Sequence, residues 1–259
     1  MSTLTKTPKH SRSDRTRSSR VDSATIANGS KSYHDETGAE EQLALSLSKT
    51  EAFANLRAKR TPIWKRLVDC LVAGSLLVLL APLLVLIAIF IRIVSKGPVF
   101  FTQSRLGLMG EEFTIYKFRT LKCSATATAD HKEYVANLSA TDGVLTKPDL
   151  SSRMIPGGKL LRQTSLDELP QLINILQGNM SLVGPRPDVM DWADYRSEQL
   201  RRFEVVPGVT GYWQVSGKNR LTFDQMIEKD LYYVDHRSCW LDLFILVKTF
   251  GLLLHRDNK

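Results

Sequence analysis

Two neighbouring acids, Asp167 and Glu168, stand in the stretch RQTSLDELPQLINIL, directly before a proline and an apolar helical pattern. One interpretation is structural, because an Asp at the start of a helix caps its unpaired backbone N–H groups. Pro170 supports Asp167 as that cap, since a proline is tolerated in the first turn of a helix and damages later turns. The spacing therefore predicts a helix over about 168–177 that is capped by Asp167 and ends at Gly178.

The same two acids can also carry chemistry. Carboxylates at a helix N-terminus face its positive end, which favours their ionised form, so we expect both acids to be ionised. An ionised Asp167 can act as a covalent nucleophile, as aspartate does in aspartyl-phosphate enzymes. Glu168 can hold Mg²⁺, which commonly binds one or two carboxylates together with substrate phosphates. The residues alone leave the structural and the catalytic interpretation open.

Basic residues in the neighbouring motifs have the chemistry of phosphate ligands. Arg162 precedes Asp167 in the same stretch, and Arg186 lies between two prolines in GPRP. Those prolines restrict the backbone and give a rigid mount for a guanidinium, which pairs with phosphate through a forked geometry. Lys117 and Arg119 in YKFRT are two residues apart, so on a strand they would share one face. We expect these cations to converge on the acid pair; ordinary surface charge is the alternative for each.

Composition and periodicity predict the elements that must position these residues. The 259-residue chain has room for one domain of about 200 residues and a tail, with the composition of a globular protein. The pattern predicts strands at 97–103 and 112–120, and helices at about 157–164, 168–177, 188–203, 222–236 and 239–254. Between them we expect irregular structure over 121–155, with a short helix near 130–139, and a turn-rich segment over 207–219. The fold class is α/β, mostly helical with a small sheet.

An apolar run without any charge covers residues 70–91. As a helix it would measure about 33 Å, enough to cross a bilayer core of about 30 Å. Pro82, near its middle, predicts a sharp kink. Because both flanks are basic, and Lys and Arg favour the cytoplasmic side, a re-entrant hairpin fits as well as a spanning helix. The apolar run over 239–254 is similarly open between a core helix and an interfacial membrane helix.

Charge and cysteines narrow the partners and the function classes. A net charge of +8 favours a partner that carries phosphate, namely anionic lipid, a nucleotide or nucleic acid. Residues 1–60 are expected to form a disordered basic tail, either solvated or resting on anionic lipid. The three cysteines have no CxxC spacing, which argues against a disulfide framework or a zinc site. The first apolar run begins near residue 67, so we expect no secretory signal peptide.

Several long motifs follow one another in the order of a known family. They are KRLVDC, the apolar run with its central proline, SKGPVFFTQSRLG, IYKFRT, RQTSLDELPQLINILQGNMSLVGPRP, PGVTGYWQVSGKN and LYYVDHRSCWLDL. Over residues 61–254 the sequence resembles the bacterial sugar transferases, also called monotopic phosphoglycosyl transferases. The competing function class is a single-span membrane protein with a cytosolic interaction or nucleic-acid-binding domain, but the sequence contains no recognisable nucleic-acid motif.

The resemblance implies an enzyme, a cofactor and a set of partners. Family members transfer a sugar 1-phosphate from a UDP-sugar to polyprenyl phosphate, such as undecaprenyl phosphate, release UMP and require Mg²⁺. The chain resembles the short catalytic form that primes exopolysaccharide and related glycans, with galactose or glucose as the first expectation for the sugar. It implies the cytoplasmic face of the bacterial inner membrane, contact with membrane lipid and a homodimer, and no nucleic acid. The implied domains are a re-entrant helix hairpin over 61–96 and a cytosolic catalytic domain with a C-terminal amphipathic helix over 97–259.

The resemblance also implies a role for each candidate site residue. Asp167 would be the nucleophile that forms a phospho-sugar aspartyl intermediate, and Glu168 would bind Mg²⁺. Five cations would contact phosphates or support the site: Lys117, Arg119, Arg162, Arg186 and Lys218. Lys218 stands where the family often has Arg, so it keeps the charge and loses the fork. Asp242, in the LDL motif, would complete the polar site, and Pro82 would break the membrane helix, preceded by Ala81 where the family often has Ser.

Overall fold

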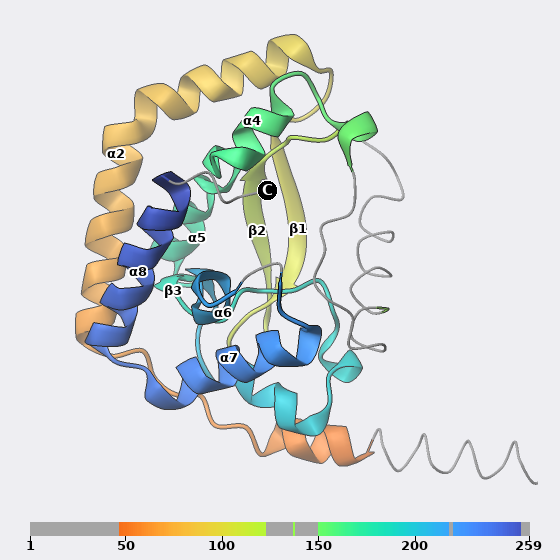
Figure 1. Ribbon diagram of the computed structural model, residues 1–259, viewed down its shortest axis with the longest axis vertical. Helices are drawn as coiled ribbons and strands as arrows, with labels where there is room; N and C mark the ends of the chain where they lie inside the picture. Colours follow the sequence, from red (N-terminus) through yellow and green to blue (C-terminus); the bar gives the residue numbers. More distant parts are fainter. Residues whose placement is uncertain (1–46, 123–136, 138–149, 218–219, 255–259) are drawn as a thin grey trace, which may run out of the picture. The chain divides into compact units, whose positions relative to one another are not determined.

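The computed structural model describes residues 47–122, 137, 150–217 and 220–254. Residues 1–46 of the predicted tail over 1–60, most of the predicted short helix near 130–139, and Lys218 lie outside these residues. Residues 47–60 of that tail are ordered, since 47–54 form a helix and Leu56 is buried in a core cluster, so the prediction of disorder is wrong there. Within them, helices predominate and the strands form two small two-stranded sheets (Figure 1). The predicted fold class, mostly helical with a small sheet, is therefore confirmed.

The apolar run forms α2 (Ile63–Val94), a 32-residue helix that bends along its length (Figure 1). Pro82 lies inside it, where the missing N–H and the ring weaken the helix and favour a bend. Among the described residues, α2 is the one helix long and apolar enough to cross a membrane, and only 11% of its most apolar window is buried. The predicted break is thus a bend within one continuous helix, and most of that helix faces away from the fold.

Polar side chains in the first turns of α2 attach it to the rest of the domain. Arg66 donates hydrogen bonds to the carbonyl oxygens of Ile175 and Leu176, which end helix α5 (Gln171–Gln177). The buried carboxylate of Asp69 accepts a hydrogen bond at 3.0 Å from the backbone N–H of Leu182. Because unpaired carbonyls at a helix end and buried carboxylates both require partners, these contacts fix α2 against α5 and against the strand that contains Leu182.

The first sheet is the hairpin of β1 (Phe100–Leu106) and β2 (Glu112–Phe118), which pair antiparallel with Phe101 opposite Lys117. The turn η1 (Leu108–Gly110) joins them. Asn174 on α5 fastens this hairpin, since its side-chain amide donates to the carbonyl of Thr114 at 2.7 Å and accepts from the N–H of Tyr116 at 3.1 Å. The hairpin edge and the helix after the acid pair are thereby held together.

The second sheet is the parallel pair β3 (Ser181–Val183) and β4 (Gly208–Thr210). Gly208 permits its close backbone approach, because a Cβ there would lie 2.0 Å from the backbone nitrogen of Gly184. The loop that carries Arg186 starts where β3 ends. The sheet therefore fixes the base of that loop.

The remaining elements agree with the predictions except over 188–203. The helices α4 (Gly158–Gln163), α7 (Phe223–His236) and α8 (Cys239–Leu254) lie close to their predicted bounds, and the turn-rich segment contains the short helix α6 (Tyr212–Val215). The single helix predicted over 188–203 is wrong. Two 3-10 segments, η4 (Trp192–Asp194) and η5 (Ser197–Glu204), replace it, and a third, η2 (Ser151–Arg153), precedes α4.

Candidate active site

Asp167 and Glu168 lie in a single 3-10 turn, η3 (Leu166–Glu168), between α4 and α5. The predicted cap is wrong: α5 begins at Gln171 with Pro170 in the N-cap position, and Asp167 makes no capping hydrogen bond. Proline fits there because the N–H that it lacks would have no partner at a helix start. The predicted helix end is confirmed, since Gly178 adopts the left-handed conformation with φ 91°. The acids are therefore free of the capping role.

Glu168 is held by two cations from different parts of the chain. The Arg186 guanidinium donates to both carboxylate oxygens, with Nη1 at 3.1 Å from Oε2 and Nη2 bonded to Oε1. The Lys117 ammonium donates to Oε1 at 3.2 Å. Burial raises the pKa of Glu168, but these two cations outweigh burial and hold that pKa well below its ordinary value. Glu168 is thus a fixed, ionised carboxylate.

Asp167 is in the opposite electrostatic condition. Within the described part of the chain its carboxylate has neither a hydrogen bond nor a salt bridge. Burial, and then the charge of Glu168, raise the pKa of Asp167 to about 6, although Lys117, Arg162 and Arg186 act in the other direction. The surroundings of Asp167 thus disfavour its ionised form, although a pKa of about 6 still leaves most of the group ionised at neutral pH. An unpaired carboxylate next to fixed cations is chemically suited to attack an electrophile that carries negative charge.

A buried arginine, Arg202 in η5, supports the loop that carries Arg186. Its side chain is 2% exposed, and it donates to the carbonyl of Arg186 at 2.8 Å and to the carboxylates of Asp188 and Asp230 at 2.6 and 2.7 Å. Burial and the neighbouring Asp188 raise the pKa of Asp230 to about 7, even though Arg202 lowers it. Because this guanidinium joins two carboxylates to the backbone of the site loop, it fixes the position from which Arg186 reaches Glu168.

Arg105 on β1 is a second arginine of this region that the sequence analysis did not single out, although it lies within the motif SKGPVFFTQSRLG. It donates to the carbonyl of Pro187 at 3.1 Å and to the side chain of Gln103 at 2.7 Å. Burial lowers its pKa to about 10, and its charge in turn lowers the pKa of Lys117. Four buried or half-buried cations thus accompany four acids around the loop: Arg105, Lys117, Arg186 and Arg202 with Asp167, Glu168, Asp188 and Asp230.

Two of the predicted site residues bind elsewhere. Arg119 follows the last residue of β2, and its guanidinium donates to the carbonyls of Ser95 and Lys96 at the end of α2. The strand alternation that would have aligned it with Lys117 no longer applies there, so the shared face was a wrong prediction.

Asp242 on α8 belongs to a separate buried network. Its carboxylate accepts from the Lys65 ammonium at 2.6 Å and from the Tyr233 hydroxyl at 2.7 Å. Asp242 thereby joins α8 to α7 and to the start of α2, so its role in the structure is to attach α2 to the domain. The structure therefore corrects the prediction that Asp242 completes the polar site, because its carboxylate binds Lys65 and Tyr233 instead.

The arrangement can position a charged phosphate group, but it offers few metal ligands. Among the described residues, no group of three or more His, Cys, Asp or Glu side chains gathers at one point. The two carboxylates of η3 are therefore the acids available to a cation at this site. Lys117 and Arg186 reach this turn through their hydrogen bonds to Glu168, and the charges of Lys117, Arg162 and Arg186 each lower the pKa of Asp167.

Comparisons with known proteins agree with this geometry. The bacterial sugar transferase family profile matches residues 60–256. The chain is 42% identical over 193 residues to the uncharacterised sugar transferase EpsL of Bacillus subtilis, covering 74% of this chain and 88% of that protein. It is 39% identical over 203 residues to the UDP-glucose:undecaprenyl-phosphate glucose-1-phosphate transferase of Caulobacter vibrioides, covering 75% of this chain and 71% of that protein.

A longer relative matches through part of its length. The undecaprenyl-phosphate galactose phosphotransferase of Salmonella typhimurium is 34% identical over 213 residues, which cover 79% of this chain and 43% of that protein. The comparisons give no support to a nucleic-acid-binding or interaction protein. Since the profile covers most of the chain, including α2, the acid pair and the cations around it, the chain belongs to the bacterial sugar transferase family.

Proposed function

We propose that this protein transfers a sugar 1-phosphate from a UDP-sugar to undecaprenyl phosphate or a related polyprenyl phosphate and releases UMP. The observation that carries the proposal is the carboxylate of Asp167, which has no hydrogen-bond or ion-pair partner among the described residues, beside the fixed ion pair of Glu168 and Arg186. The names of the Caulobacter and Salmonella relatives support the reaction class. Those names give glucose and galactose as the first sugars to test. As the context of the reaction we propose the first membrane step of exopolysaccharide or related glycan synthesis.

The reaction follows in two balanced steps. The Asp167 carboxylate attacks the phosphorus that bears the sugar, the bond to the bridging oxygen breaks, and UMP leaves. A phosphate oxygen of the polyprenyl phosphate then attacks the same phosphorus, which frees Asp167 and gives the polyprenyl diphosphate sugar. Each step brings anions together, so Lys117, Arg162 and Arg186 offset the repulsion and stabilise the charge that develops on the phosphoryl oxygens.

The residues fit a Mg²⁺ ion that takes most of its ligands from substrate phosphates and water. Mg²⁺ is commonly bound by one or two carboxylates, with substrate phosphates and water completing its shell. Glu168 and Asp167 supply two carboxylates at adjacent positions, and Asp167 carries a charge that the described residues leave unpaired. When bound, the ion would neutralise phosphate charge. Glu168 would be its principal protein ligand and would keep its orientation through Arg186 and Lys117.

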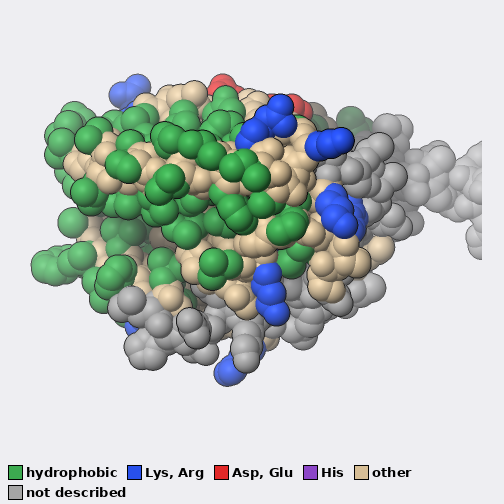
Figure 2. Space-filling view, turned by 90° about the horizontal axis from the view of Figure 1, so that it is seen from above, with side chains coloured by type: hydrophobic (Ala, Val, Ile, Leu, Met, Phe, Trp, Pro, Cys, Tyr) green, Lys and Arg blue, Asp and Glu red, His purple; other side chains and the backbone are tan. Residues whose placement is uncertain are grey.

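We also propose that α2 enters and leaves the cytoplasmic leaflet of the inner membrane as a bent, re-entrant helix. Its exposed side chains are mostly large and apolar, including Ile63, Leu71, Val78, Leu79 and Ile93. Figure 2 shows hydrophobic side chains gathered over one face of the molecule, with Lys and Arg side chains at its edge. An apolar face edged by cations matches the boundary between acyl chains and anionic headgroups.

The activity is tested by UMP release across a panel of UDP-sugars with polyprenyl phosphate and Mg²⁺. Wild-type protein should release UMP with one sugar preferred, and Asp167→Asn should release none while its circular dichroism stays that of the wild type. Full activity in Asp167→Asn would exclude Asp167 as the nucleophile. Omission of Mg²⁺ should abolish release, and its return should restore it.

The topology is tested by labelling single cysteines near residues 50 and 100, after replacement of Cys70, Cys123 and Cys239. A re-entrant helix places both positions on the cytoplasmic side, so a membrane-impermeant reagent should label neither in intact cells. Labelling of one position alone would show a spanning helix.

A further inference from the structure

An apolar groove runs along the outer side of α8, away from the acid pair's own turn. Its volume is about 590 Å³, and it is lined by Val215 of α6 and by residues of α8: Trp240, Leu243, Phe244, Val247, Lys248, Gly251 and Leu252. The lining side chains are conspicuously exposed for their chemistry, with Trp240 80% and Val247 63% accessible. A surface of this kind requires an apolar occupant or an apolar solvent.

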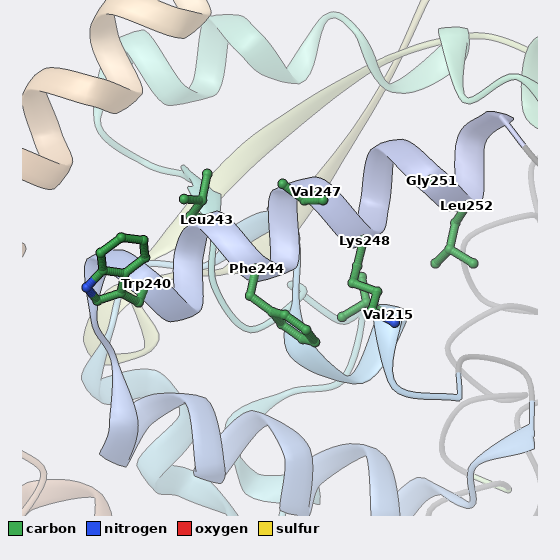
Figure 3. A pocket seen from close by; sticks show the side chains of 8 residues that line it. All are labelled: Val215, Trp240, Leu243, Phe244, Val247, Lys248, Gly251 and Leu252. Carbon is green, nitrogen blue, oxygen red and sulfur yellow. The ribbon is translucent and has the colours of Figure 1, made fainter.

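The polar feature of the groove is a single ammonium. Lys248 lies between Phe244 and Leu252 on one stripe of α8, and Figure 3 shows these three side chains projecting on the side where Val215 lies. Its Nζ is 5.7 Å from the centroid of the Phe244 ring. A lysine within an apolar stripe extends its head toward anionic groups at the edge of the hydrocarbon. The lining therefore matches a molecule with a hydrocarbon chain and one phosphate.

The opposite side of the same helix is joined to the active site. Thr249, next to Lys248, shares a hydrogen bond of 2.7 Å with Thr210 on β4. The carbonyl of Val209, one residue earlier, accepts from the Arg186 guanidinium at 3.1 Å. Only one layer of helix and strand thus separates the groove from the cation that fixes Glu168.

We infer that this groove binds a segment of the isoprenoid chain of the polyprenyl phosphate acceptor, with Lys248 at its edge attracting the anionic end. The inference rests on the proposed function, because that reaction brings to this surface a lipid with one apolar chain and a phosphate. The cation and the apolar lining provide charge and chemical complementarity to this lipid. Exposed apolar side chains also lie along α2, including Leu71, Val78 and Leu79.

Gly251 offers a variant that fills the groove and leaves the core unchanged. A Cβ at this position would have no heavy atom within 4 Å, so Gly251→Leu places a side chain in open space on the groove side and also improves helix propensity. Gly74 on α2 has the same open surroundings and does not line the groove, so Gly74→Leu is the matched control.

The test combines photolabelling with acceptor kinetics on the full-length protein in nanodiscs. A diazirine-bearing polyprenyl phosphate should label peptides from α8, and unlabelled polyprenyl phosphate should compete while phosphatidylglycerol should not. Gly251→Leu should lower the labelling and raise the acceptor KM by about 5–10-fold, as expected for the loss of about 1 kcal/mol of apolar contact. The KM for the UDP-sugar, and the KM for a short acceptor of two isoprene units, should not change. Lys248→Gln should raise the KM of both acceptors.

Four outcomes would overturn the inference. They are labelling outside α8, equal competition by phosphatidylglycerol, crosslinks between two copies of the chain through this groove, and wild-type kinetics in Gly251→Leu. Failure of the proposed function is distinguishable, because wild-type protein would then release no UMP, whereas the labelling map would still report whether the groove binds the lipid.

Discussion

Arg186 donates hydrogen bonds to both carboxylate oxygens of Glu168, one of them at 3.1 Å, while the neighbouring Asp167 has no such partner among the described residues. Two adjacent acids therefore have opposite properties: the pKa of Glu168 is lowered and that of Asp167 is raised to about 6. Environments that separate the pKa values of two neighbouring carboxyl groups are typical of acids with distinct catalytic roles. Glu168 is suited to hold charge in place and Asp167 to react.

The activity should rise with pH through about 6, because only the ionised form of Asp167 can attack phosphorus. At pH 5 the value of kcat/KM for the UDP-sugar should be about a tenth of its plateau, as expected for a pKa one unit higher. The measurement is UMP release between pH 5 and 8.5. Asp230, whose pKa is raised to about 7, is the other nearby group that could cause this pH dependence. Asp230→Asn is therefore the control, and in this variant the activity should still rise near pH 6. A profile that is flat from pH 5 to 8 would contradict the assignment.

Asp167→Asn should stabilise the fold at pH 8 while it removes activity. The folded-state pKa of Asp167 is raised above its ordinary 3.8, so ionisation of Asp167 destabilises the folded state as pH rises through about 6. Asparagine removes this term, and the expected gain is about 1–2 kcal/mol at pH 8, less than the full pKa shift implies because solvent screens a half-buried group. The gain should vanish as pH falls below the ordinary pKa of 3.8, because Asp167 is then protonated in both the folded and the unfolded state. Urea unfolding at pH 8 and at about pH 3 measures the difference.

Arg186→Lys should lower kcat/KM by about 100-fold, because lysine keeps the charge and loses the fork that fixes both oxygens of Glu168. Arg162→Lys is the matched control. Arg162 affects Asp167 through its charge, which lysine retains, and has no hydrogen bond from its guanidinium within the described residues. The control should therefore lose less than about tenfold. Equal losses in both variants would show that the fork has no special role.

The parts of the fold that sequence patterns predicted are those governed by local chemistry. The hairpin strands follow their aromatic and β-branched runs, and α5 ends at Gly178, whose φ of 91° suits glycine. The segment over 188–203 failed because its conformation follows a tertiary network. Arg202 is held there by Asp188 and by Asp230, a residue of α7. The contact with Asp230 cannot be predicted from the pattern of residues within 188–203.

The site was predictable by residue type and less so by position. Arg186 was predicted from its mount between two prolines, and Lys117 from its place on a strand and from the family resemblance, although they lie 18 and 51 residues from Glu168. Asp242 was misplaced because its partner, Lys65, lies 177 residues away in the chain, so the pairing is visible only in three dimensions. Arg105 was missed for a related reason: burial of a single arginine on a strand leaves no distinct sequence signal.

Arg202 and its neighbour Arg201 offer a test of the support beneath the site loop. The Arg202 side chain is 2% exposed and paired with two carboxylates, whereas that of Arg201 is 44% exposed and pairs with Asp235 at the surface. Arg202→Met should destabilise the fold by about 3–5 kcal/mol, because it leaves buried acids without their cation. Arg201→Met should change stability by less than about 1 kcal/mol, as is usual for surface ion pairs.

A second variant of Arg202 separates its effect on the stability of the fold from its effect on the position of Arg186. Arg202→Lys keeps a charge between Asp188 and Asp230 but cannot make all four of the arginine's hydrogen bonds, including the one to the carbonyl of Arg186. We expect Arg202→Lys to remain folded at 20 °C, with a lowered kcat and an unchanged acceptor KM, since the displaced group is the mount of Arg186. Saturating Mg²⁺ should not restore kcat. A folded Arg202→Lys variant with wild-type kcat would show that the network stabilises the fold without positioning Arg186.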